Sequence, residues 1–253
     1  MLIGKTEKKL LEYIKNNGTI CLALIDSENT SKKNTIDIVK KAEKNGIKGF
    51  LIGGSTISDQ IELNKITKTI KSITSLPVIL FPGNITGISQ YADAIFFNSL
   101  LNSDDLYYII QAQMLSAPLI KKRNLEAIPV GYIVIGDGGT IGYIGKARGI
   151  PPDKGNIAAM YALAAQYMGM RFVYLEAGSG VNSHIPSTLI KKVRKLFDGV
   201  LIVGGGIKNS KNALEIANAG ADIIVIGTLL EENNNDRMLN EITNIIKKKN
   251  DIK

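Results

Sequence analysis

The sequence contains very little cysteine and histidine, because Cys21 and His184 are each the single residue of their type. One cysteine cannot form an internal disulfide, and one histidine cannot supply a metal site built from several histidines. A disulfide-stapled scaffold and a zinc framework are therefore excluded. The metal that the chain could favour is a hard divalent ion with oxygen ligands.

A long hydrophobic run is also missing. The opening stretch MLIGKTEKKLLEYIKNNG places charges where a signal peptide needs apolar residues, and no later run reaches the roughly 18 apolar residues of a membrane span. We expect a soluble, cytoplasmic protein. The hydrophobic content of 45% excludes a disordered chain, and the absence of a linker or repeat predicts one domain over residues 1–253.

The charge balance is basic, with 31 Lys and Arg against 23 Asp and Glu, which gives a net charge of +8. Basic groups at 121–123, 191–195 and 247–249 fall on expected helices without interleaved aromatic residues. This pattern is typical of solvated helix faces, and attraction of an anionic ligand or surface is the alternative. We expect no nucleic-acid partner.

Eight short runs rich in Ile, Val and Leu are too continuous for strands with one wet face, and they predict buried parallel strands. The runs are 19–25, 47–52, 77–81, 94–97, 127–135, 172–175, 200–203 and 223–226. Amphipathic stretches alternate with them at 35–44, 59–73, 104–120, 155–168, 186–197 and 211–219, and helices are also expected at 7–15 and 237–248.

Strands and helices in this order predict an α/β fold, a (β/α)8 TIM barrel with an extra N-terminal helix. A doubly wound sheet is the rival, but 25–28 (Ile-Asp-Ser-Glu) is not the glycine-rich turn of a dinucleotide fold. Only residues 82–93 separate the third and fourth strands, which predicts a shortened or missing third helix and a gap in the helical ring. Residues Tyr107 to Ile110 and Met114 are interpreted as a buried helix face, and lining a groove beside the gap is the alternative.

The active site of such a barrel lies at the carboxyl ends of its strands. Glycines follow strands seven (Gly204, Gly205, Gly206) and eight (Gly227, then Thr228), where a backbone can approach an anion and helix N-termini point toward it. These loops predict a phosphate site, with simple turns as the alternative. Ser179 and Gly180 are expected to add a hydroxyl and an amide.

Three further side chains at strand ends are candidates for chemistry. Glu176 follows Tyr174 at a spacing of two, so both point the same way, and we predict Glu176 as a general base with Tyr174 as its catalytic neighbour. A structural carboxylate is the alternative for Glu176. Asp26 and Ser55, at the ends of adjacent strands, are predicted Mg2+ ligands, and loop or capping roles are the alternatives.

Other chemistry-bearing residues receive structural interpretations. His184 is expected to cap or lie on the surface, and Cys21 to pack in the core of the first strand. The glycine-rich stretch 137–143 predicts a long connection that serves as a lid or forms a mobile turn.

Short motifs follow one another along the barrel: LID (24–26), IGGS (52–55), FPGN (81–84), GGTIG (138–142), YLEAGSG (174–180), IVGGGI (202–207) and IGT (226–228). In this order they resemble the geranylgeranylglyceryl phosphate synthase family. The resemblance covers nearly the whole barrel, and YLEAGSG is its most specific part. Many relatives carry Asp-Pro after the first strand, whereas here Ser27 follows Asp26.

The resemblance implies transfer of a geranylgeranyl group from geranylgeranyl diphosphate to the 3-hydroxyl of sn-glycerol 1-phosphate, with release of diphosphate and a requirement for Mg2+. The glycerol phosphate would contact Tyr174, Leu175, Glu176, Ala177, Gly178, Ser179, Gly180, the 204–206 glycines, Gly227 and Thr228. Asp26 and Ser55 would hold the Mg2+, and the prenyl tail would enter at the gap around 82–93.

Three alternatives stay open from the residues. The donor could be a longer prenyl diphosphate such as heptaprenyl, the protein could be a sugar-phosphate isomerase or aldolase on the same barrel, or it could be a non-catalytic anion-binding protein. A Schiff-base aldolase needs a lysine inside the barrel, and the strand runs contain none in a central position. We also expect a homo-oligomer and transient contact with a membrane surface through lysines.

Overall fold

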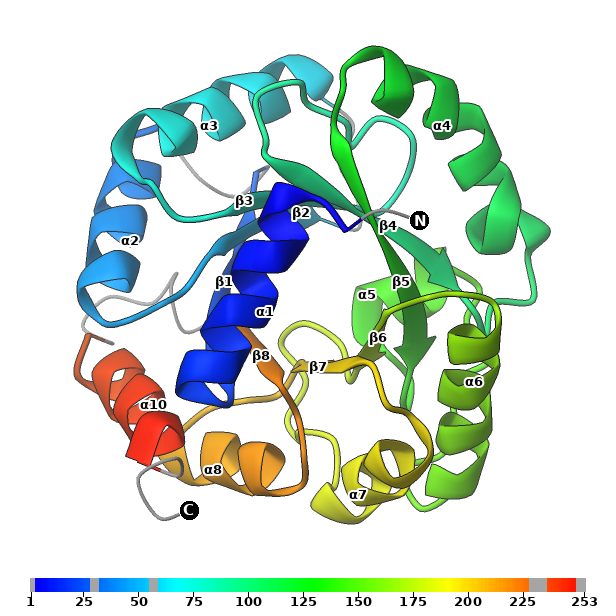
Figure 1. The fold of residues 1–253 in the computed structure, drawn as a ribbon. Helices are drawn as coiled ribbons and strands as arrows, with labels where there is room; N and C mark the ends of the chain where they lie inside the picture. Colours follow the sequence, from blue (N-terminus) through cyan, green and yellow to red (C-terminus); the bar gives the residue numbers. More distant parts are fainter. Residues whose placement is uncertain (1–2, 28–31, 55–58, 228–235, 249–253) are drawn as a thin grey trace.

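Eight parallel strands close into a barrel in sequence order in a computed structural model of the chain, which describes residues 3–27, 32–54, 59–227 and 236–248 (Figure 1). The strands are β1 (Ile20–Asp26), β2 (Phe50–Gly54), β3 (Val78–Pro82), β4 (Ala94–Leu100), β5 (Glu126–Val134), β6 (Phe172–Glu176), β7 (Val200–Gly204) and β8 (Ile223–Ile226). The predicted TIM barrel is confirmed.

Most of the helices lie around the outside of the barrel, between successive strands (Figure 1). The helices are α1 (Lys5–Asn17), α2 (Lys32–Lys44), α3 (Gln60–Ile73), the π-helix η1 (Tyr107–Gln111), α4 (Ala112–Lys122), α5 (Gly139–Ile144), α6 (Gly155–Tyr167), α7 (Ser187–Leu196), α8 (Ser210–Asn218) and α10 (Asp236–Lys248). Of these, α1 and α5 do not belong to the outer ring (Figure 1). Each predicted helix is present, with ends that differ by a few residues. Within the described ranges, none of them is long and apolar enough to cross a membrane.

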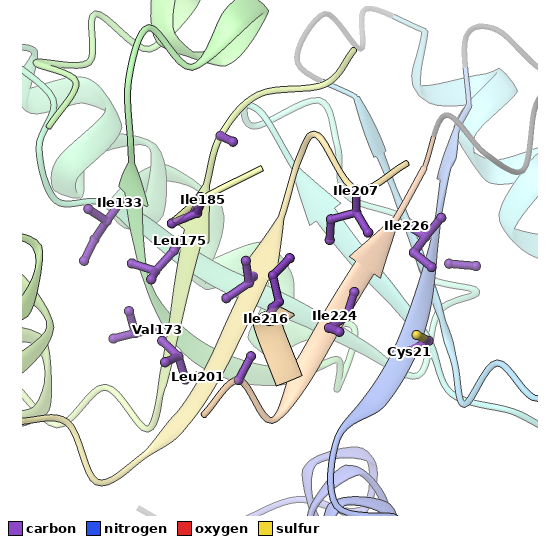
Figure 2. Close-up of a cluster of buried hydrophobic side chains, with 14 of the residues drawn as sticks. Cys21, Ile133, Val173, Leu175, Ile185, Leu201, Ile207, Ile216, Ile224 and Ile226 are labelled. Carbon is purple, nitrogen blue, oxygen red and sulfur yellow. The ribbon is translucent and has the colours of Figure 1, made fainter. Parts of the chain in front are cut away.

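The alternation of side chains along each strand divides the core in two. On β6, Phe172 and Tyr174 point into the barrel, whereas Val173 and Leu175 point outward to the helices. Figure 2 shows part of the outer layer, where Val173 and Leu175 lie beside side chains of neighbouring strands. Cys21 belongs to this outer layer, and its burial raises the thiol pKa to about 12, so the predicted packing role is confirmed.

Helix α1 lies across the amino-terminal end of the barrel (Figure 1). Its Leu10 is fully buried with the interior cluster, and its first turn is fixed by a strand residue, because the carboxylate of Glu126 accepts hydrogen bonds from the N–H groups of Thr6 and Glu7, both at 2.8 Å. The carboxylate of Glu7, buried in turn, pairs with Arg171 at 2.5 and 2.6 Å. These contacts close the end of the barrel opposite the predicted site.

No helix connects β3 to β4, so the missing third helix is confirmed; in Figure 1 only loop segments lie between α3 and α4. The predicted helix at 104–120 begins instead as η1 and runs to Lys122. Ile110 and Met114 are exposed, so the interpretation of a buried face is wrong for them. A helical repeat identifies an apolar face, but the neighbouring helix that would bury this one is absent here.

Candidate active site

A single continuous pocket joins the carboxyl-terminal rim of the barrel to the gap beside β4. Its rim end is lined by backbone and small residues of the loops after β6, β7 and β8: Ser179, Gly180, Gly205, Gly206 and Gly227. Its other end is lined by apolar side chains of the gap loop, β4, η1 and α4, including Ile85, Ile88, Phe96, Tyr108 and Ala112. The pocket therefore has one end suited to an anion and another suited to a hydrocarbon.

Glu176 lies on the wall of this pocket at the last position of β6. It is 6% exposed, and its Oε1 accepts a hydrogen bond from the N–H of Gly178 at 2.7 Å. Its Oε2 accepts one from the hydroxyl of Tyr132 at 3.1 Å, and the hydroxyl of Tyr174 is a further hydrogen-bond partner. The structure thus places Glu176 and Tyr174 together, as the alternation along β6 predicted.

Burial raises the pKa of Glu176 above its ordinary value, and the hydrogen bonds from Gly178, Tyr132 and Tyr174 oppose that rise. The pKa values of both tyrosines are raised well above their ordinary value, first by burial and then by the charge of Glu176. Both phenols consequently keep their protons and act as donors. Such a carboxylate, held in a buried pocket with fixed orientation, is suited to accept a proton from a bound hydroxyl.

An aromatic cluster forms the floor beneath Glu176. The ring of Phe81 stacks on that of Tyr174 with centroids 5.1 Å apart, and Tyr132 meets each of them edge to face at 5.3 and 5.2 Å. Phe96 extends the cluster toward the gap, 6.0 Å from Phe81. These contacts restrict the rotation of both tyrosines and thereby fix the donors that hold Glu176.

Two glycines at the end of β7, Gly204 as its last residue and Gly205 just after it, are required by sterics. A Cβ on Gly204 would overlap the hydroxyl of Tyr174, and a Cβ on Gly205, whose φ is +86°, would crowd Oε1 of Glu176. The sequence motif was interpreted as a phosphate loop, and the structure adds a second reason for its glycines. They make room for the two candidate catalytic side chains.

The model of the PcrB family matches residues 13–246 of this chain. The chain belongs to the PcrB family. The chain is similar over nearly its whole length to the geranylgeranylglyceryl phosphate synthase of Nitrosopumilus maritimus. The two are 50% identical over 245 residues, which make up 97% of this chain and 98% of that protein.

Two solved structures agree with the PcrB assignment. The (S)-3-O-geranylgeranylglyceryl phosphate synthase of Thermoplasma acidophilum, in complex with its substrate sn-glycerol-1-phosphate, has a TM-score of 0.92 and 39% identity and covers 98% of this chain and 100% of that chain. The wild-type GGGPS of Thermoplasma volcanium has a TM-score of 0.91 and 40% identity, with coverages of 95% and 97%. The family resemblance drawn from the sequence motifs is confirmed.

In this PcrB family chain, not all of the other residues predicted to contact the substrate or metal face the pocket. The side chain of Leu175 packs in the outer layer, away from the pocket (Figure 2), and Ala177 also belongs to that layer, so neither side chain faces a ligand. Gly178 holds Glu176 through its N–H. Thr228 and Ser55 lie outside the described residues.

Asp26 ends β1 and pairs in register with Gly53 of β2, so it lies at the carboxyl-terminal end of the barrel. Its even spacing from Leu22 and Leu24 puts it on the interior face of the strand. The hydroxyl of buried Ser27, next along the chain, has no hydrogen-bond partner among the described residues. Oxygen donors at this position fit a hard ion such as Mg2+.

In the part of the chain that the structure describes, no group of three or more His, Cys, Asp or Glu side chains is placed to hold a metal ion. Mg2+ often keeps waters and takes its other ligands from substrate phosphates. The donor set therefore fits an ion that arrives with an anionic substrate.

Sequence reasoning missed Tyr132, which donates to Glu176. Its signal was present, because Val130, Tyr132 and Val134 alternate along β5 and face the barrel interior. What the sequence could not supply was the strand register, which sets Tyr132 opposite Tyr174.

Two interpretations of loop residues also have outcomes. His184 lies 3.3 Å from the carboxylate of Glu215 on α8 and does not line the pocket, in accord with a structural role. The stretch 137–143 contains the start of α5 and is not an irregular loop throughout. Thr140 and Ile141 of this segment line the pocket. Gly178 packs so closely on Gly138 that a Cβ on Gly178 would collide with the backbone of Gly138.

Proposed function

We propose that this chain transfers a geranylgeranyl group from geranylgeranyl diphosphate to the 3-hydroxyl of sn-glycerol 1-phosphate, which forms an ether lipid precursor. One observation carries the proposal: Glu176 lies on a pocket whose rim end offers glycine loops for a phosphate and whose other end is an apolar groove. The membership of the PcrB family, and the names of its relatives, support the same reaction.

The residues define the course of the reaction. The phosphate of the acceptor would bind the N–H groups of Ser179, Gly180, Gly205 and Gly206, with its 3-hydroxyl toward Glu176. Glu176 takes the hydroxyl proton as the acceptor oxygen bonds to the first carbon of the prenyl chain. The bond from that carbon to the diphosphate breaks, and the diphosphate leaves with the electron pair.

The apolar part of the pocket would hold the prenyl chain. Each CH2 group removed from water contributes about 0.8 kcal/mol, so the groove along β4 and α4 would supply much of the donor affinity. When bound, Mg2+ would neutralise the charge that grows on the leaving diphosphate. Asp26 is the described residue suited to hold it, and Ser55 is proposed as a second ligand.

Incubation with Mg2+, sn-glycerol 1-phosphate and prenyl diphosphates of graded length, followed by mass analysis of extracted lipids, tests the proposal. We expect one ether product, made from geranylgeranyl diphosphate. A product formed only with the heptaprenyl donor would indicate the longer-chain activity instead. No product with any donor would reject the transferase and favour a sugar-phosphate reaction, although the eight strands contain no lysine for a Schiff-base aldolase.

The Asp26→Ala variant tests the metal proposal. We expect the Mg2+ concentration needed for half-maximal turnover to rise, because a carboxylate ligand is lost while those from the diphosphate remain. Titration of Mg2+ at saturating substrates gives the measurement, and Asp59→Ala, at the N-cap of α3, is the control carboxylate. An unchanged Mg2+ titration would remove Asp26 as a ligand.

Tyr132→Phe tests how the base is tuned. Loss of the hydroxyl removes a donor that favours the ionised form of Glu176, so we expect its pKa to rise further and the acidic limb of the kcat profile to move to higher pH. Turnover at alkaline pH should approach that of the parent protein. The exposed Tyr167→Phe is the control, and a loss of kcat that is equal at every pH would contradict this positioning role.

We also propose self-association through α6. This helix contains no charged residue, and Ile157, Met160 and Tyr167 are exposed along it. A helix with large apolar side chains on its outer face is normally covered, which supports a homo-oligomer. Light scattering should give a mass above that of one chain, and Met160→Glu should reduce it. The single buried Cys21 is compatible with a reducing, cytoplasmic location.

A further inference from the structure

Exposed apolar side chains border the outer mouth of the groove. Ile85 of the gap loop both lines the groove and is 40% exposed. On the opposite side, Ala112 and Ser116 of α4 line the groove while neighbouring side chains of η1 and α4 face outward. We call the exposed set the groove rim: Ile85 (40%), Leu106 (56%), Ile110 (54%), Met114 (59%) and Leu115 (53%).

The two segments that carry the groove rim contain no acidic side chain. The gap loop from 82 to 92 contains no charged residue, and the segment from 106 to 123 contains no Asp or Glu but ends in Lys121, Lys122 and Arg123. Of the two acidic residues just before this segment, Asp104 is exposed and Asp105 is paired with Lys146 at 2.8 Å. An apolar surface bordered by cations, without carboxylates of its own, is complementary to anionic lipid headgroups over an acyl interior.

We propose that the groove rim docks on an anionic bilayer, so that a prenyl donor passes from the lipid into the groove along its own apolar path. The proposal rests on the proposed function for the nature of the donor. A second protein chain on the same face would cover the mouth through which the donor must enter. A bilayer covers the rim and leaves the mouth open to lipid.

The test is flotation with vesicles of equal parts phosphatidylcholine and phosphatidylglycerol, without any substrate. The double variant Ile110→Glu with Met114→Glu removes two exposed apolar side chains and lowers the net charge by two. Lys191→Glu, on α7 at a distant part of the ring, lowers it by the same amount (Figure 1). We expect the double variant to lose vesicle affinity by about tenfold or more and the control to keep most of it.

Several results would overturn the proposal. The first is that the parent protein does not float with the vesicles, and the second is that the double variant floats as well as the parent. The third is that Lys191→Glu loses as much vesicle affinity as the double variant, which would mean that net charge alone attracts the protein. A smaller oligomer in the double variant by light scattering would mean that a second copy covers the rim. Circular dichroism confirms that each variant is folded.

Turnover with the donor supplied in detergent separates this proposal from the transferase itself. The double variant should retain it, because neither changed residue lines the groove. If the parent protein turns over substrate in detergent but does not bind vesicles, the docking surface is rejected and the transferase activity stands. The absence of product from the parent protein would reject the proposed function, whatever the vesicles show.

Discussion

Glu176→Gln should lose about 10² to 10⁴-fold in kcat and yet be more stable than the parent protein at neutral pH. The amide cannot accept the proton of the acceptor hydroxyl, but it is close in size: its oxygen can accept the hydrogen bond of Gly178, and its NH2 group can donate to the hydroxyl of Tyr132. Binding of sn-glycerol 1-phosphate, measured by calorimetry, should be nearly unchanged. Unaltered turnover would remove Glu176 as the base.

The gain in stability follows from the raised pKa. Because the folded-state pKa of Glu176 lies above its ordinary value of 4.5, the folded protein holds the proton more tightly than the unfolded chain. The contribution to stability is complete below the unfolded pKa and is lost as the pH rises through the folded pKa. Glutamine carries no charge to bury, so the variant avoids this loss at neutral pH.

Thermal unfolding as a function of pH measures the effect. The difference in Tm between Glu176→Gln and the parent protein should be positive at pH 7 and shrink toward zero below about pH 4.5, where both side chains are neutral. Glu241→Gln, at an exposed position on α10, is the control and should show no such gain. A variant less stable than its parent at pH 7 would show that the ionised carboxylate stabilises the fold.

Arg171→Ala should lower the free energy of unfolding by about 3–5 kcal/mol, because it leaves the buried carboxylate of Glu7 without its partner. Glu7 is 1% exposed, and both of its oxygens bond the guanidinium, at 2.5 and 2.6 Å. Denaturation in urea, with the slope checked for constancy, gives the measurement.

Two comparisons make the Arg171 prediction specific. Arg237→Ala removes an exposed pair with Glu241 on α10 and should change stability by no more than about 0.5 kcal/mol. Adding Glu7→Gln to Arg171→Ala should recover much of the loss, since a neutral amide costs less to bury than a carboxylate. A loss as small as that of Arg237→Ala would mean that water replaces the guanidinium.

The sequence predicted those features that depend on local periodicity. Eight apolar runs gave the strands, and the spacing of two between Tyr174 and Glu176 placed both side chains on the barrel interior. The short segment between the third and fourth strands predicted the gap. These inferences need only the repeat of the backbone and the length of a connection.

Features that depend on contacts between distant segments were not predicted. Tyr132 reaches Glu176 through the register of β5 and β6, and the steric role of Gly204 appears only when Tyr174 is seen beside it. The exposure of Ile110 and Met114 was missed because a periodic pattern does not say whether another element covers the face. Such information resides in tertiary neighbours.

The short connection between β3 and β4 also leaves an incomplete hydrogen-bond ladder. Only two residue pairs join these strands, whereas seven join β4 and β5. Beyond that ladder, side-chain amides bond the strand backbone in place of a partner strand: Gln113 donates to the carbonyl of Asn98 at 2.5 Å, and the amide of Asn98 donates to the carbonyl of Pro82, the last residue of β3, at 3.4 Å.

Side-chain amides beside a hydrocarbon groove would otherwise be unexpected. Here they satisfy backbone groups where β3 and β4 are paired over only part of their length, because an acyl chain lying there could not form hydrogen bonds with those groups. Replacing these amides with aliphatic side chains to raise the affinity for lipid would therefore leave backbone groups without hydrogen-bond partners. The barrel would be destabilised between β3 and β4, where its strands share the fewest residue pairs.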